Sequence, residues 1–373
     1  MTGSTLPRHS GEGRSTLLTA AAKRQTVAGM TDPATLHRAL LTIDTHIDIP
    51  WPDGPSPFED GPRRVDLPKM LRGGLAAGCF AAYIPQGARD DAAHEAAFAR
   101  AIAMLGAIRA MGHPQPNGGG PASGLTGRIA TTVAEIESAR ADGVPAIIPA
   151  VENGYAIGTE VDRLTRLRAL GARYLTLTHN GHNALADAAI PRPDLGDKAE
   201  AHGGLSPLGR AAIGRMNALG MLVDVSHAAR STMVQAAEAS RTPVLATHSA
   251  IRALCDHPRN LDDGQLDVLR ATGGLIQITA VPAFLKADAK AGEVGLAEFA
   301  AHIDYAVQRI GIAHVGIGSD FDGGGGFTGW HDAAESPNVT AELLRRGYDR
   351  PAIAALWGGN FLRLLRLAEQ AAA

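Results

Sequence analysis

Short apolar runs alternate with longer stretches of helical periodicity along most of the chain. The first run, residues 41–49, is rich in Ile and Thr and is followed by Pro50 and Pro52, as expected of a strand that stops there. Seven similar runs follow it. The predicted strands are 41–49, 78–85, 144–151, 174–178, 221–226, 243–247, 274–279 and 314–319. Near-continuous apolar strands that alternate with helices indicate a parallel sheet covered by those helices.

The predicted helices fill the segments between these strands. They lie at 33–41, 90–111, 131–141, 160–170, 206–219, 229–240, 262–271, 296–310 and 351–369. Eight strand–helix units in 373 residues favour an α/β fold, a (β/α)8 TIM-type barrel in a single domain. A doubly wound open sheet is the alternative, but it normally carries a glycine-rich nucleotide turn after its first strand. That place holds His46, Ile47 and Asp48 here.

The first 31 residues differ from the rest of the chain. Residues 1–31 are rich in Gly, Ser, Thr and charged side chains, without a hydrophobic period. We predict that they form a disordered N-terminal arm and that residues 32–373 form one barrel domain.

Most of the predicted strands end in a residue that can bind a metal ion or transfer a proton. His46 and Asp48 are two positions apart on the first strand, so they share one face. Later strands end in Glu152, His179, His227, His248 and Asp320. Taken singly, each residue has an ordinary explanation as a cap or turn residue. Taken together at the mouth of a barrel, four imidazoles and three carboxylates indicate a divalent metal centre, because buried ionisable groups need partners.

The number of candidate ligands favours two ions over one. His46, Asp48, Glu152, His227 and His248 exceed the three protein ligands of an open catalytic zinc site. A carboxylate such as Glu152 can bridge two ions, and a water between the ions can supply hydroxide as the nucleophile. The ligand types would hold zinc, cobalt or manganese equally well.

Two of the polar strand-end residues remain free for the chemistry. Asp320 could accept the proton of the attacking water and pass it to a leaving amine. His179 could polarise the scissile carbonyl and stabilise the oxyanion.

Charge and composition exclude several classes of protein. The net charge of −3 gives no sign of a nucleic-acid surface or of a basic membrane patch. No run reaches the roughly 18 apolar residues of a membrane span, and charged residues interrupt any secretory signal. Two cysteines, Cys79 and Cys255, indicate a reducing compartment, so we expect a cytoplasmic protein. Large barrels are commonly dimers, and a homodimer is expected.

Several sequence motifs surround the candidate residues. They are DTHID at 44–48, VENG at 151–154, LTLTHN at 175–180, GMLVDVSH at 220–227, THS at 247–249, CDHPRNL at 255–261, GSDFDG at 318–323 and GGNF at 358–361. In this order they resemble the membrane (renal-type) dipeptidases, metallopeptidase family M19 of the amidohydrolase-like superfamily. The resemblance runs from about residue 43 to residue 365.

The resemblance implies a binuclear zinc dipeptidase that hydrolyses free dipeptides through a metal-bridging hydroxide. It implies that one Zn²⁺ is bound by His46 and Asp48 and the other by His227 and His248. Glu152 would bind both ions.

The same resemblance implies roles for four further residues. His179 would polarise the substrate carbonyl, and Asp320 would transfer the proton. Arg259 would pair with the free carboxylate of the dipeptide, for which a guanidinium fork is suited. Tyr83, at the end of the second predicted strand, would help to hold the substrate.

Three other functions remain open. A related metal-dependent amidohydrolase could act on N-acyl amino acids or on other amides or lactams. A non-catalytic metal-binding barrel would lack Asp320 or a ligand, and all of them are present. A phosphate-handling barrel would use the glycine run at 323–326, but no basic residue flanks that run.

Overall fold

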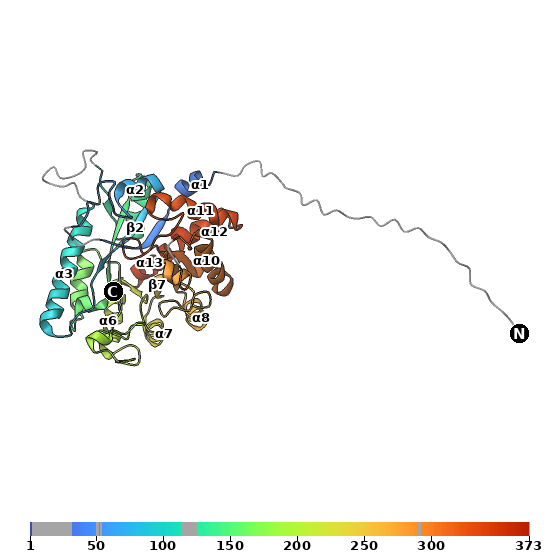
Figure 1. The fold of residues 1–373 in the computed structure, drawn as a ribbon. Coiled ribbons are helices and arrows are strands. Elements are labelled where there is room, and N and C mark those ends of the chain that lie inside the picture. Colours follow the sequence, from blue (N-terminus) through green and yellow to red (C-terminus); the bar gives the residue numbers. More distant parts are fainter. Residues whose placement is uncertain (2–31, 50–51, 53, 113–124, 290–291, 373) are drawn as a thin grey trace. The chain divides into compact units, whose positions relative to one another are not determined.

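The computed structural model describes Met1 and residues 32–49, 52, 54–112, 125–289 and 292–372 (Figure 1). The compact unit Pro33–Ala373 contains all helices and strands of the described part. Apart from Met1, the predicted disordered arm lies outside the described residues. The division of the chain at residues 31 and 32 therefore stays a prediction.

Eight parallel strands form the ring of a (β/α)8 barrel, which confirms the predicted fold class. The strands are β1 (Ile43–Asp48), β2 (Ala77–Tyr83), β4 (Ala146–Glu152), β5 (Tyr174–Thr176), β6 (Leu222–Asp224), β7 (Leu245–Ser249), β8 (Leu275–Ile278) and β9 (Val315–Ile317). They are hydrogen-bonded in this order, and the two-residue strand β3 (Arg128–Ile129) pairs with β4. All eight predicted strands are present.

The helices surround the ring of strands, as Figure 1 shows. They are α1 (Pro33–Ala39), α2 (Leu67–Gly73), α3 (Asp91–Ala110), α4 (Val133–Ala141), α5 (Arg163–Ala169), α6 (Pro207–Ala218), α7 (Arg230–Ala239), α8 (Asp263–Thr272), α9 (Pro282–Leu285), α10 (Leu296–Ile310), α11 (Ser336–Arg345), α12 (Arg350–Ala354) and α13 (Asn360–Ala371). No helix of the described residues is both long enough and apolar enough to cross a membrane.

Side-chain caps fix where several of these helices begin. Thr132 accepts a hydrogen bond from the Glu135 amide at the start of α4, and the Glu135 side chain accepts one from the Thr132 amide. Asp262 and Gln265 form the same reciprocal pair at α8. Such a capping box satisfies amides that have no partner within the helix.

The sequence prediction missed three helices and did not foresee an irregularity in the last one. Helices α2, α9 and α11 fall in segments for which no helix was predicted. The helix predicted at 351–369 is divided by a π-helical turn at Ala355–Gly359. A Cβ atom on Gly358 would lie 2.7 Å from the Leu41 carbonyl oxygen, so this turn brings helix backbone close to the start of β1.

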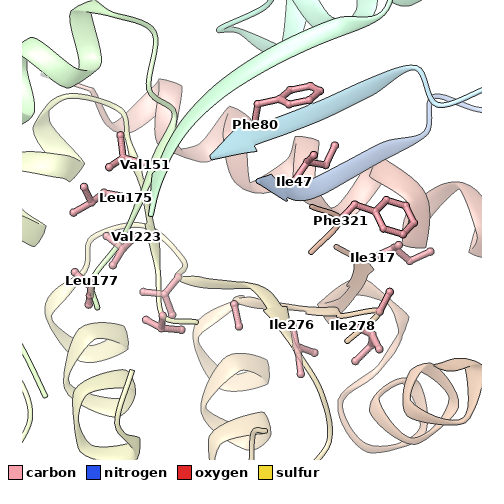
Figure 2. Close-up of a cluster of buried hydrophobic side chains, with 14 of the residues drawn as sticks. Ile47, Phe80, Val151, Leu175, Leu177, Val223, Ile276, Ile278, Ile317 and Phe321 are labelled. Atoms are coloured by element: carbon pink, nitrogen blue, oxygen red, sulfur yellow. The ribbon is translucent and has the colours of Figure 1, made fainter. Parts of the chain in front are cut away.

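The core lies in two clusters on opposite faces of the strands. Side chains such as Phe80, Val151, Leu175 and Ile276 point outward from the ring into the layer between strands and helices (Figure 2). Their strand neighbours, which include Ile148, belong to a second cluster inside the ring. Because successive side chains of a strand point to opposite faces, the residues at the C-terminal end of each strand can place polar groups on the inner face.

Strand β1 departs from this regular alternation. Ile43 belongs to the inner cluster and Ile47 to the outer one, although four positions separate them. The pairing with β2 shifts register between Asp44 and Ile47, which accounts for the change of face. Beyond the shift, His46 and Asp48 both face the inside of the mouth, as the alternation predicts.

Candidate metal centre

The polar residues at the C-terminal ends of the strands converge at one mouth of the barrel. Closure of the ring brings β1 next to the segment after β9, where the Asp320 amide donates to the His46 carbonyl oxygen at 3.0 Å. The Asp48 amide donates to the Phe321 carbonyl oxygen at 2.9 Å. The structure thus joins residues that are more than 270 positions apart in the sequence.

One half of the centre is a triangle of electron-pair donors around Glu152. The Nε2 atoms of His227 and His248 lie 3.0 Å apart, and Glu152 Oε1 lies 3.2 Å from the first and 3.4 Å from the second. Donors that bind one tetrahedral zinc ion at about 2.0–2.1 Å stand roughly 3.3 Å apart. The spacing of these three atoms therefore suits a single ion.

The other half of the centre faces the second oxygen of the same carboxylate. Glu152 Oε2 lies 3.6 Å from His46 Nε2, and Asp48 Oδ1 lies 3.6 Å from that nitrogen. Asp320 Oδ1 is slightly farther away, at 3.9 Å. His46, Asp48 and Glu152 form one of the ligand groups whose atoms lie within 4.8 Å of one another. Glu152 consequently stands between two sets of donors.

Two observations indicate that this donor set fits a cation. His46 Nε2 and Asp48 Oδ1 are buried and have no hydrogen-bond partner among the described residues. Hydrogen bonds also place the imidazole protons away from the centre. His227 Nδ1 donates to Asn180 Oδ1 at 3.1 Å, which leaves its Nε2 with a lone pair. Buried lone pairs without donors need a positive charge nearby.

The electrostatics of the centre lead to the same conclusion. Burial lowers the pKa of His227 and of His248 well below the usual value, and the Arg259 guanidinium lowers both further. Burial also lowers the pKa of His46, but the carboxylates of Glu152 and Asp48 more than offset this effect and raise it well above normal. The imidazoles of His227 and His248 are therefore neutral, whereas the carboxylates around His46 attract positive charge.

Asp320 reaches the centre from a tight, unusual stretch of backbone. Its φ is 61°, in the left-handed region that Asp tolerates better than most residues. Burial raises the pKa of its carboxyl well above normal, and the nearby Asp48 and Glu152 carboxylates add to the shift. A Cβ atom on Gly323 would lie 2.4 Å from Asp320 Oδ1 and 2.7 Å from Asp48 Oδ2. Glycine at this position leaves the space between the two carboxylates open.

A cavity of about 280 Å³ opens onto the centre. Its lining includes Asp48, Glu152, Asp320, Tyr83 and His179. The rings of Tyr83 and His179 lie 4.7 Å apart. Burial lowers the pKa of His179 to about 3, and the positive charge of Arg259 adds to the effect. His179 is therefore neutral at physiological pH and can donate a hydrogen bond from its ring. It also lies within 4.8 Å of donor atoms of Glu152 and His227.

Arg259 lies beside the centre. Among the described residues, its guanidinium makes no hydrogen bond to the carboxylates of the centre. Its Nη2 donates to the His248 carbonyl oxygen at 3.1 Å, and its guanidinium lies 5.5 Å from the Phe284 ring centroid. Its Nε is buried without a hydrogen-bond partner among the described residues. Burial lowers the pKa of Arg259 to about 10, so it stays charged at pH 7. Together with His227 it borders a second cavity of about 390 Å³.

All nine residues proposed from the sequence thus lie at or beside the mouth, but the residues that orient them were not predicted. Asn180 contacts His227, Tyr174 contacts His46, and Thr247 and Asp224 support the imidazoles from the inner face of β6 and β7. The sequence contained a clue to these residues, since Tyr174, Asp224 and Thr247 occupy inward positions of strands. Asn180 follows a strand end within the motif at 175–180.

A parallel barrel with imidazoles and carboxylates gathered at the C-terminal ends of its strands defines the class of metal-dependent barrel hydrolases. Comparison with known proteins gives the family. The family described as membrane dipeptidase, peptidase family M19, matches residues 30–373. The chain therefore belongs to the membrane dipeptidase family M19, which confirms the resemblance seen in the motifs.

Individual relatives agree with this assignment. The dipeptidase tcpJ of Claviceps purpurea is 30% identical over 336 residues, which are 89% of this chain and 75% of that protein. The dipeptidase aclJ of Aspergillus oryzae is 38% identical over 216 residues, which are 58% of this chain and half the length of that relative.

A solved structure is also very similar. The probable dipeptidase PvdM of Pseudomonas aeruginosa has a TM-score of 0.85 and 31% identity, over 91% of this chain and 98% of that one. A metallopeptidase of Rhodobacter sphaeroides, liganded with a phosphinate mimic of the dipeptide L-Ala-D-Ala, has a TM-score of 0.74 and 28% identity. The matched region covers 88% of this chain and 99% of the Rhodobacter sphaeroides chain.

Proposed function

We propose that this chain is a dipeptidase that binds two zinc ions and hydrolyses the peptide bond of free dipeptides. The observation that carries the proposal is the position of Glu152. Its two carboxylate oxygens face two separate groups of donors, at 3.2–3.4 Å on one side and 3.6 Å on the other. A single buried carboxylate between two such groups is suited to bridging two ions.

The proposed ligands follow from this arrangement. His46 and Asp48 would bind one ion, His227 and His248 the other, and Glu152 both. When bound, the ions would act as Lewis acids and make hydroxide available as a bridging nucleophile near neutral pH. Zinc is the metal we propose, because imidazole and carboxylate ligands at these spacings are typical of it.

Asp320 is the residue that we propose for proton transfer. It borders the 280 Å³ cavity, and its carboxyl oxygen lies 3.9 Å from His46 Nε2, farther than the oxygens of Asp48 and Glu152 at 3.6 Å. A carboxyl group in this position can take a proton from the attacking water and return it to the amine that leaves.

His179 and Tyr83 line the same cavity as Asp320. As a neutral imidazole, His179 can donate a hydrogen bond to the carbonyl oxygen as negative charge develops on it. Tyr83, whose pKa burial raises to about 12, keeps its phenolic proton and can donate a hydrogen bond to the substrate.

Arg259 is the residue that we propose for recognition of the substrate carboxylate. It is buried and charged and has guanidinium donors beyond the one given to His248. A carboxylate paired with Arg259 would direct the C-terminal side chain of the substrate toward the 390 Å³ cavity. The dipeptide mimic carried by the Rhodobacter sphaeroides relative supports a substrate of this size.

The test is amine release from matched free and N-acylated dipeptides, with zinc-loaded and chelator-treated protein. We expect zinc-dependent cleavage of the free dipeptides alone. Zinc-dependent cleavage of the N-acylated set alone would move the substrate to N-acyl amino acids or other amides, and would keep the metal mechanism. Activity that does not respond to zinc would contradict the proposal. The homodimer and the cytoplasmic location stay predictions.

A further inference from the structure

A single hydroxyl group contacts one histidine from each half of the metal centre. Thr247, on β7, is fully buried. Its Oγ1 lies 2.9 Å from Nδ1 of His248 and 3.2 Å from Nδ1 of His46. We propose that Thr247 is a positioning residue that holds both imidazoles with Nε2 directed at the ions. This inference rests on the two-ion centre proposed above.

The direction of each hydrogen bond follows from the neighbouring carboxylate. Asp224 Oδ1 accepts the amides of Ser226 at 2.9 Å and Thr247 at 3.0 Å. Asp224 Oδ2 accepts the Thr176 hydroxyl at 2.6 Å and the Thr247 hydroxyl at 2.7 Å. Four donors converge on this group, as expected for an acceptor-only carboxylate.

The Thr247 hydroxyl therefore has no proton left for the histidines. A hydroxyl has one proton and two lone pairs, and the proton is directed at Asp224. Both lone pairs remain to accept Nδ1–H of His248 and of His46, while the Ser226 hydroxyl lies farther away at 3.4 Å. A proton on Nδ1 leaves Nε2 of each neutral ring unprotonated, which is the form that binds a metal ion.

The two histidines do not depend on Thr247 equally. His46 Nδ1 has a second acceptor, the Tyr174 hydroxyl at 2.9 Å, which itself donates to the Thr45 carbonyl oxygen at 3.1 Å. Among the hydrogen bonds of the described residues, Thr247 is the only partner of His248 Nδ1. Loss of the hydroxyl should therefore weaken the half that contains His248 and spare the half that contains His46.

The experiment is a competition titration of metal-free protein with Zn²⁺ and a chelator, which yields both binding constants. We expect Thr247→Val to weaken one ion about tenfold to a hundredfold, the usual effect of removing an outer partner of a ligand. Thr247→Ser should restore wild-type affinity. Tyr174→Phe alone should change either constant by less than about threefold, and the double variant should weaken both ions.

Thr178→Val is the matched control, because the Thr178 hydroxyl is also buried at a strand end but has no hydrogen-bond partner in the described part of the chain. It should leave both constants unchanged. Thr247→Ala removes the same hydroxyl without a methyl group against Asp224 and serves if Thr247→Val does not fold.

Three results would overturn the inference. Wild-type affinity in folded Thr247→Val or Thr247→Ala would show that the hydroxyl does not act on the ligands. If Thr247→Val and Thr178→Val weakened the binding of both ions to the same extent, the cause would be a general packing effect. A wild-type protein that binds fewer than two ions would remove the proposed centre itself, and with it this role of Thr247.

Discussion

At the scale of the residue, the proposal of two metal ions rests on the positions of the two carboxylate oxygens of Glu152. Each oxygen faces its own set of donors, and His46, His227 and His248 turn their Nε2 atoms toward Glu152. The sequence identified these residue types and their places at strand ends. It could not show which oxygen faces which imidazole, because those distances depend on side-chain orientations set by Asn180, Thr247 and Tyr174.

Replacement of Asp320 with Asn tests its role in proton transfer. The amide keeps the shape of the side chain but cannot accept and return a proton, so kcat should fall by about 10²- to 10⁴-fold with little change in KM. Steady-state kinetics with a free dipeptide measure this. Turnover equal to that of the wild type would refute the assignment.

Replacement of Gly323 with Ala tests whether the space between Asp320 and Asp48 is needed. The added Cβ would lie under 3 Å from both carboxylates, so zinc binding at the His46 half and activity should both decrease. Gly106→Ala, in α3, is the matched control because its added Cβ meets nothing within 4 Å. That control should stabilise the protein by up to about 1 kcal/mol without affecting zinc. Zinc affinity equal in the two variants would contradict the explanation.

Replacement of Arg259 with Met tests recognition of the substrate carboxylate. Hydrogen bonds to a charged group contribute about 1.5–3 kcal/mol, so kcat/KM for free dipeptides should fall by at least about tenfold. The same dipeptides with a C-terminal amide should be cleaved equally well by variant and wild type. If both substrates lose activity to the same extent, Arg259 acts through the structure of the site instead.

At the scale of the element, the alternation of apolar runs with helical segments predicted most of the barrel. The eight strands were recognisable because each is a short apolar run between helical segments. The register shift in β1 was not. It coincides with contacts that the sequence does not show, in which Asp44 accepts the His46 amide within the strand and the Ser319 amide across the closed ring. The π-helical turn before α13 escaped prediction for a similar reason, since it depends on the close approach of Gly358 to Leu41.

Contacts between α1 and α11 predict a dependence of stability on pH. His37 is buried, its Nδ1 lies 2.7 Å from the Thr340 hydroxyl, and burial followed by the charge of Arg38 lowers its pKa from 6.5 to about 4. The unfolded chain therefore binds a proton below pH 6.5 that the folded chain does not. The contribution of His37 to the free energy of unfolding should be fully present above pH 6.5. It should fall by up to roughly 3 kcal/mol as the pH drops to 4.

Denaturant unfolding of the metal-free protein and of a His37→Asn variant, from pH 7.5 to 4, measures this contribution. The free energy difference between the two should shrink across that interval, because the variant lacks the titrating group. A difference that stays constant with pH would show that His37 does not contribute in this way.

At the scale of the whole molecule, barrel closure explains how residues from 46 to 320 come to share one centre. Parallel strands place all their C-terminal ends at one mouth, so a list of strand-end residues already predicts what will converge. The shapes of the two cavities beside the centre could not be predicted, because they depend on the loops that follow β5 to β9.

The most direct test of this account is a crystal structure of the zinc-loaded protein with anomalous scattering measured at the zinc edge. Two peaks are expected, one beside His46 and Asp48 and one beside His227 and His248, with one Glu152 oxygen bound to each. A single peak, or two peaks that do not share Glu152, would contradict the central claim.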